Sequence, residues 1–226
     1  MDTAENNNEK KEIDGNAEIT RQDKERTPAE TTVAGDECCI CLDNLPWDTT
    51  KFVRWMCCGN GMHIHCVNDL DSMGMSGSCP LCRAPTPSSA EEQVNQLRPW
   101  VKKKKAWAQY LMGQMYFEGT GVKQSHVMAR MLYELAAQQG YVSAIYNLGV
   151  MYDNSQGVEQ SYERAFEYYE QAADLGHPLA QFNLGGMYYK GAGVVRDIAK
   201  AKEWWIKAAA QGLEEAIKTL KLINSS

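Results

Sequence analysis

The sequence predicts a mostly α-helical protein, in which an α-solenoid of helix-turn-helix repeats follows a small cysteine-rich module and a disordered N-terminal tail. Two observations carry this prediction. All eight cysteines of the 226-residue chain lie between Cys38 and Cys82. From residue 106 onward, the sequence repeats itself with a fixed period of 36 residues. A fixed period of this length is typical of solenoids.

Composition narrows the classes of function. The formal net charge is −6, which argues against a nucleic-acid partner, because such proteins present a strongly basic face. The N-terminus has no apolar core of a signal peptide, and no apolar run is long enough to span a membrane. We therefore expect a cytoplasmic or nuclear protein with no membrane partner. In those reducing compartments, clustered cysteines bind metal more often than they form disulfides.

The chain divides into four predicted parts. Residues 1–35 are polar and carry few large apolar side chains, so we expect a disordered tail. Residues 36–84 hold the cysteine-rich module, and residues 85–105 form a linker with a short helix capped by Ser89 and ended by Pro99. Residues 106–226 contain three repeats, at 108–143, 144–179 and 180–215, and a C-terminal cap helix.

The cysteine-rich module has the spacing of a metal site. Two C-x-x-C pairs, Cys38/Cys41 and Cys79/Cys82, flank a central cluster. The central cluster contains Cys57, Cys58, His63 and Cys66. Thiolates and imidazoles suit tetrahedral Zn²⁺. A mixed set of about eight ligands favours two zinc ions over the alternative, an iron–sulfur cluster.

The order of these pairs, together with C79-P-L-C82-R and H63-I-H65-C66, resembles the RING finger family. The resemblance implies a cross-brace, in which the first and third pairs hold one zinc ion and the second and fourth pairs hold the other. Cys38, Cys41, His63 and Cys66 would then form site one, and Cys79 and Cys82 would belong to site two. A plant-homeodomain finger shares this ligand order but carries an aromatic residue where this chain has Gly77.

One corner departs from the RING pattern. Cys58 is followed by Gly59, and Asn60 occupies the expected ligand position. We predict that Cys57 and Cys58 together complete site two; the alternative is a weaker site that uses Asn60 or a water molecule. His65 and Cys39 are interpreted as residues beside the sites.

The RING resemblance also implies a docking groove for a ubiquitin-conjugating enzyme. Its contacts map onto Ile40, Leu70, Pro80, Leu81 and Arg83. Many family members have Trp at the Leu70 position, and leucine supplies less aromatic area. Arg83 stands where the family places the cation that bridges enzyme and ubiquitin, a role that suits a guanidinium. Such a module would act by positioning, without a covalent intermediate.

The repeat aligns without gaps. Equivalent positions include Ala108, Ala144 and Ala180; Gly113, Gly149 and Gly185; Tyr116, Tyr152 and Tyr188; Gly121, Gly157 and Gly193; and Gly140, Gly176 and Gly212. Each unit predicts two helices joined by a glycine turn. We expect Ser125, Ser161 and Asp197 to cap the second helix, and Gly140, Gly176 and Gly212 to end it.

This pattern, best seen in G193-V-V-R-D197-I-A-K200-A201, closely resembles the Sel-one-like repeats, relatives of the tetratricopeptide repeats. The first copy is looser, with Met128 and Leu135 where the third has Lys200 and Lys207. Since Ser89 lies 36 residues before Ser125, residues 89–98 are expected to fill the second-helix position of a degenerate earlier unit.

The repeat pattern also predicts which side chains are buried in the core and which are exposed. The tyrosines at the Tyr116 position are predicted to be core, because every unit makes the same packing demand there. Trp205 and Tyr168 are predicted to be exposed and available for contact. His126 and His177 are interpreted as surface histidines.

Together these patterns predict a zinc-binding RING-type ubiquitin ligase that takes its protein partner through the repeats. The alternative is a zinc-stabilised interaction scaffold without ligase activity. No nucleophile, acid–base pair or phosphate loop is apparent in the sequence.

Overall fold

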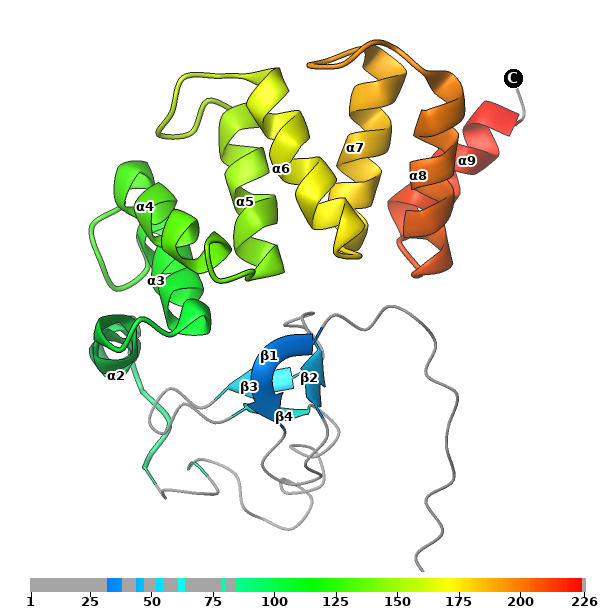
Figure 1. Cartoon of the computed structure of the whole chain (residues 1–226). Helices are drawn as coiled ribbons and strands as arrows, with labels where there is room; N and C mark the ends of the chain where they lie inside the picture. The colour runs from blue at the N-terminus through cyan, green and yellow to red at the C-terminus, as the bar shows by residue number, and fades with distance from the viewer. Residues whose placement is uncertain are drawn as a thin grey trace, which may run out of the picture.

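The protein is described here by a computed structural model, which describes residues 32–37, 44–46, 52–54, 61–63, 79 and 84–224. Within these residues, helices dominate (Figure 1). The helices are α2 (Ala90–Lys102), α3 (Ala106–Glu118), α4 (His126–Ala137), α5 (Val142–Asp153), α6 (Tyr162–Asp174), α7 (Pro178–Lys190), α8 (Ile198–Ala210) and α9 (Glu214–Asn224). No helix in the described segments is long and apolar enough to cross a membrane.

The helices form an α-solenoid, which confirms the predicted architecture of the repeat region. Each helix packs against the next one along the chain, from α2 to α9, and together they make one curved row (Figure 1). The first helices of the units, α3, α5 and α7, are buried over most of their surface. The second helices, α4, α6 and α8, bury one face and expose the other. The second helices therefore supply an exposed ridge.

The predicted caps of the second helices are present. The side chains of Ser125, Ser161 and Asp197 each accept a hydrogen bond from the backbone N–H three residues later. The backbone N–H groups of these three residues also donate to the carbonyls of Tyr116, Tyr152 and Tyr188. Each cap therefore also fastens the turn of its unit to the preceding first helix.

The predicted glycine stops are also confirmed. Gly140, Gly176 and Gly212 have φ of +79°, +89° and +87°. This left-handed conformation costs glycine little because it has no Cβ. The residue after each glycine donates its N–H back to a carbonyl in the last turn of the helix, as Tyr141 does to Ala136. This bond satisfies a carbonyl that the helix end would leave unpaired.

Within each unit, an aromatic ring lies directly on a glycine of the first helix. The pairs are Gly113 with Tyr133, Gly149 with Tyr169, and Gly185 with Trp205. A Cβ at Gly149 would lie 2.7 Å from the ring of Tyr169, well inside van der Waals contact. The glycine is therefore required for the two helices to approach this closely.

This arrangement corrects the assignment of Trp205. Trp205 was predicted to be exposed, but it is 4% exposed and its Nε1–H donates to the carbonyl oxygen of Phe182 at 3.0 Å. Trp205 occupies the position of Tyr133 and Tyr169 in the other units, so it meets the same packing demand. Tyr168, by contrast, is half-buried and stacks on Tyr152.

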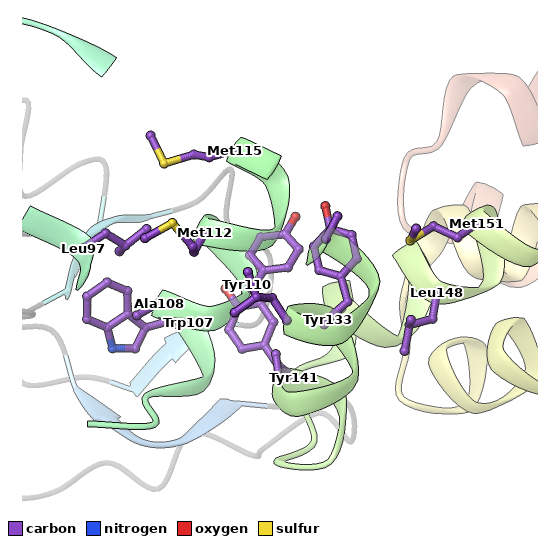
Figure 2. Packing of buried hydrophobic residues seen from close by; sticks show 14 of the residues in the cluster. Leu97, Trp107, Ala108, Tyr110, Met112, Met115, Tyr133, Tyr141, Leu148 and Met151 are labelled. Carbon is purple, nitrogen blue, oxygen red and sulfur yellow. The ribbon is translucent and has the colours of Figure 1, made fainter. Parts of the chain in front are cut away.

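The repeated tyrosines follow the core prediction in two units. Tyr152 and Tyr188 are buried, whereas Tyr116 is partly buried and packs against the core at the start of the solenoid. Figure 2 shows the centre of that core, where the ring of Tyr110 lies close to those of Tyr133 and Tyr141. Leu97 of α2 and Trp107 of α3 belong to the same cluster.

Helix α2 occupies the second-helix position of a unit that precedes the first repeat. A Cβ at Gly121 would lie 2.5 Å from the carbonyl oxygen of Ala90, at the start of α2. Gly157 packs in the same way on His126 of α4, and Gly193 on Tyr162 of α6. These contact positions are again 36 residues apart. The start of the solenoid is therefore covered by α2.

The prediction that Pro99 ends this helix is wrong. Helix α2 continues to Lys102 with Pro99 inside it. A proline removes one backbone hydrogen bond and crowds the preceding turn. Here Trp100 and Val101, which follow it, pack against the buried core, and their burial offsets that loss.

Within the described residues, four short strands precede the helices. β1 (Thr32–Glu37) pairs antiparallel with β2 (Asn44–Pro46), and β3 (Phe52–Arg54) pairs antiparallel with β4 (Gly61–His63). β1 begins inside the range 1–35 that was assigned to a disordered tail; its residues Thr32 and Val33 favour strands. Residues 1–31 lie outside the described residues.

Two neighbouring glycines of α7 test the ring-on-glycine contact. Gly185→Ala should destabilise the protein by about 1–3 kcal/mol, because the added methyl group overlaps Trp205. Gly186→Ala should instead stabilise it by about 0.5–1 kcal/mol, because alanine favours helix and a Cβ at Gly186 meets nothing within 4 Å. Urea unfolding of both variants measures this; equal effects would contradict the packing described here.

Ser155 provides a second test. It has φ of +56°, while the equivalent residues of the other units are glycines, Gly119 and Gly191, also left-handed. Left-handed backbone costs a residue with a Cβ about 1–2 kcal/mol. We expect Ser155→Gly to be about 1 kcal/mol more stable than Ser155→Ala, which keeps the strain. Thermal unfolding of the two variants decides it.

Candidate partner-binding surface of the repeats

The predicted metal and docking residues lie almost entirely outside the described residues. These are Cys38, Cys41, Cys57, Cys58, Cys66 and Cys82, the side chain of His63, and Ile40, Leu70, Pro80, Leu81 and Arg83. Cys79 is the predicted ligand whose side chain is described. It is buried, and its backbone N–H donates to the carbonyl of Ala84 at 2.8 Å. The metal sites thus stay a prediction.

The pairing of β3 with β4 shows where in the chain the segment that departs from the RING pattern lies. Arg54 of β3 pairs with Gly61 of β4, and Phe52 pairs with His63. The segment 55–60 that joins these two strands contains Cys57, Cys58 and Asn60, and it lies outside the described residues. The backbone of His63 is at the end of β4.

The clearest binding feature of the described residues is a cavity beside Gly186. Its volume is about 510 Å³. It is lined by Asp153, Tyr162, Phe182, Asn183, Gly186, Met187, Tyr189, Lys190, Ala192, Trp205, Thr219, Leu222 and Ile223. Most of these residues are apolar or aromatic, and a few are polar or charged. This composition is typical of sites that hold an apolar group and orient it through a few polar contacts.

Gly186 makes this cavity possible. The equivalent positions of the first two units carry side chains, Gln114 and Val150. A Cβ at Gly186 would meet nothing within 4 Å, so packing against a neighbour does not require glycine here. The third unit therefore lacks a side chain at a position where the first two units carry one. Sequence comparison between the units could have revealed this site.

Charged residues also belong to the lining of this cavity. Asp153 accepts a hydrogen bond from the Tyr169 hydroxyl at 3.3 Å, and Lys190 lies at the end of α7. An apolar lining that includes an acid and a base is suited to an amino-acid side chain of a protein partner.

Four tyrosines of the repeats have hydroxyls with a raised pKa: Tyr110, Tyr133, Tyr146 and Tyr169. Burial raises the pKa of all four tyrosines above the ordinary value. Their hydroxyls consequently remain protonated near neutral pH.

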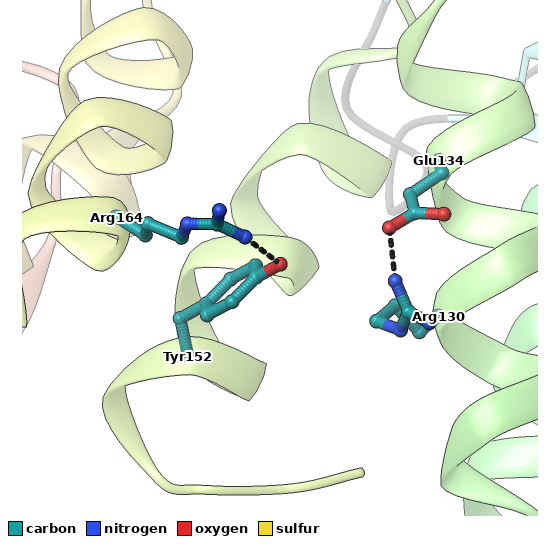
Figure 3. Close-up of polar contacts among 4 residues, drawn as sticks. All are labelled: Arg130, Glu134, Tyr152 and Arg164. Carbon is teal, nitrogen blue, oxygen red and sulfur yellow. Dashed lines mark hydrogen bonds and ion pairs between the residues drawn. The ribbon is translucent and has the colours of Figure 1, made fainter. Parts of the chain in front are cut away.

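A second cavity, of about 450 Å³, has a different chemistry. Arg130 and Arg164 line it together with Tyr152 and Glu159. As Figure 3 shows, Arg130 pairs with Glu134 at 2.6 Å and Arg164 donates to the hydroxyl of Tyr152 at 2.9 Å. Both guanidinium groups thus already have protein partners, which makes this cavity less suited to a ligand than the first.

The two histidines differ from the surface assignment. His177 is 6% exposed; its Nδ1 accepts a hydrogen bond from the N–H of Ala180 at 3.3 Å, and its ring stacks on Tyr146. It caps α7, so its role is structural. His126 is half-buried beside Phe117. The residue types at equivalent positions, such as Tyr141, did not indicate a capping role.

Filling the cavity should prevent a ligand from binding without unfolding the protein. Indole serves as the probe ligand, because it is the apolar ring of a tryptophan side chain. In NMR spectra we expect indole to shift the amide signals around Trp205, and Gly186→Val to abolish these shifts because valine occupies the space. The protein should stay folded, since valine is present at the equivalent position 150. Gln114→Val introduces valine at the equivalent position of the first unit, away from the cavity, and should leave indole binding unchanged. Binding by Gly186→Val at wild-type affinity would contradict the assignment.

Comparison with known proteins agrees with the repeat geometry. The family model described as Sel1 repeat matches residues 108–141, 142–177 and 178–213. A search of curated proteins found no match.

Two solved structures are similar over the repeats. A Sel1 repeat protein from Oxalobacter formigenes is 38% identical, with a TM-score of 0.54, over 57% of this chain and 98% of that protein. The protective antigen c5321 of uropathogenic Escherichia coli, which displays an SLR fold, is 36% identical, with a TM-score of 0.55, over 57% of this chain and 27% of that protein. The chain thus spans about a quarter of the antigen. By its three matched repeats and this similarity, the chain belongs to the Sel1 repeat family.

Proposed function

We propose that this chain is a zinc-binding RING-type ubiquitin ligase, or a ligase subunit, that recruits a protein partner through its Sel1 repeats and a ubiquitin-conjugating enzyme through its cysteine-rich module. The cavity beside Gly186 is the observation that carries the recruiting role. Its lining is mostly apolar and includes Asp153 and Lys190, and it lies beside a glycine where the other units carry side chains.

The ligase role is supported by the order of the cysteines and histidines in the sequence. Cys38, Cys41, His63 and Cys66 would hold one zinc ion; Cys57, Cys58, Cys79 and Cys82 would hold a second. Thiolates and imidazoles are zinc ligands, and a module with so small a core needs such a staple to fold. Ile40, Leu70, Pro80, Leu81 and Arg83 would then contact the conjugating enzyme.

A scaffold without ligase activity is the second candidate. It is favoured by the Asn60 departure and by Leu70, which offers less contact area than the tryptophan common in RING fingers. Both candidates use the repeats to bind a protein partner, and they differ in whether ubiquitin transfer follows.

A reconstituted reaction separates the two candidates. The full chain is combined with activating enzyme, a panel of conjugating enzymes, ubiquitin and ATP. Ubiquitin chains are expected, and Ile40→Ala and Arg83→Ala should lose them, because both remove predicted contacts to the conjugating enzyme. Cys39→Ser, which changes a cysteine outside the predicted ligand set, should keep activity. Absence of chains with every conjugating enzyme would favour the scaffold.

Metal content tests the zinc sites independently of activity. We expect about two zinc ions per chain, each with four ligands, and about one after Cys58→Ser. A chelator should unfold the cysteine-rich module but leave the thermal transition of the helical circular-dichroism signal unchanged, because the described helices form their own core. One zinc ion in the wild type would show that the Cys57–Cys58 corner does not complete a site.

A further inference from the structure

The exposed face of α4 differs from that of every other second helix. Four residues of α4 are classed as exposed, and all four are large and apolar: Val127, Met128, Met131 and Leu135, with exposures of 52%, 39%, 48% and 44%. We call these four residues the α4 patch. Large apolar patches on the surface of a soluble protein mark interaction sites more often than scattered single residues do.

Comparison between units shows that the solenoid does not need this patch. The equivalent residues are Glu91, Glu92, Asn95 and Pro99 in α2; Glu163, Arg164, Glu167 and Gln171 in α6; and Ala199, Lys200, Glu203 and Lys207 in α8. All of these positions are exposed as well. Most carry polar or charged residues, so packing within the repeats does not explain why α4 is apolar here.

The patch also carries little charge of its own. Beside it on α4, Arg130 and Glu134 neutralise each other through an ion pair of 2.6 Å. The neighbouring second helices are acidic at the same level: Glu91 and Glu92 stand on α2, and Glu163 and Glu167 on α6. Basic residues beside these carboxylates are Arg164 on α6 and Arg98 near the end of α2. The patch is therefore an apolar strip whose borders carry mostly carboxylates beside Val127, Met128 and Met131.

We propose that the α4 patch binds a basic amphipathic helix of a partner protein. Apolar residues on one face of that helix would cover Met128, Met131 and their neighbours, and lysines or arginines along its edges would face the carboxylates of α2 and α6. Apolar anchors at three-, four- and seven-residue spacings suit helix-on-helix contact. Methionines adapt well to such surfaces. This inference rests on the proposed recruitment of a protein by the repeats, and names a second surface for it.

Charge decides between this occupant and two others. A second copy of the chain would bring the acidic borders of α2 and α6 close to each other, and the chain as a whole has a net charge of −6. The N-terminal segment 1–31 is also acidic in balance and has few large apolar residues. A basic amphipathic helix matches both the apolar strip and its borders.

The test uses the full chain and a synthetic amphipathic helix with leucines on one face and lysines on the other. Calorimetry is expected to show saturable one-to-one binding that weakens with added salt. NMR shift changes should centre on α4. The same peptide with glutamates in place of lysines should bind about tenfold more weakly or not at all.

The variants of the α4 patch introduce residues that stand at the equivalent positions of other units. Met131→Glu installs the residue that α6 and α8 carry, so the fold should be retained, and affinity should fall about tenfold or more. Ile206→Glu is the matched control: Ile206 is 57% exposed on α8, and glutamate stands at its equivalent positions 134 and 170. It should leave affinity and thermal stability unchanged.

Three results would overturn the proposal. One is equal binding by Met131→Glu and wild type; another is equal binding of the lysine and glutamate peptides. The third is a wild-type dimer in light scattering that Met131→Glu converts to monomer, since a second copy would then cover the patch. The ubiquitin assay and the indole titration at Gly186 do not involve α4, so their outcome distinguishes failure of this inference from failure of the proposed function.

Discussion

The contact between a glycine and an aromatic ring inside each unit sets the geometry of the solenoid. Because Gly113, Gly149 and Gly185 lack a Cβ, the rings of Tyr133, Tyr169 and Trp205 lie directly on the first helix. Each ring belongs to the second helix and packs on the first, and the other buried side chains of the core pack around it. The caps and glycine stops fix where each helix begins and ends, but this contact fixes how close the two helices come.

Because the units share this geometry, differences between them become informative. Gly186 and the α4 patch both differ in residue type from the equivalent positions of the other units. In a solenoid each unit contacts its neighbours alone, so a residue that differs from its equivalents without a packing reason is a candidate for function. The two surfaces lie on different helices and have different chemistry: the first is a cavity whose lining includes charged residues, and the second is an apolar strip.

Much of the helical fold was predictable from the sequence, because its signals are local and repeated. Capping by Ser125 and the left-handed Gly140 follow from residue type and position alone. The burial of Trp205 required knowing that it replaces a ring that covers a glycine, and the cap by His177 required its place relative to Tyr146. Helix α2 passes Pro99 because core packing outweighs a local preference, which sequence patterns do not weigh. The cavity arises where five helices meet, so its full lining could not be read from any one segment.

The contact of each loop glycine with the second helix of the preceding unit has a consequence for which residues of the protein can change. Gly121, Gly157 and Gly193 touch the backbone at the start of α2, α4 and α6, at Ala90, His126 and Tyr162. The side chains of these three residues differ completely, yet the contact between the units is the same. Because this contact does not depend on the exposed side chains, those side chains can be substituted without changing how the units stack. Mutations on the exposed ridge can therefore alter which partner it binds while the solenoid keeps its geometry.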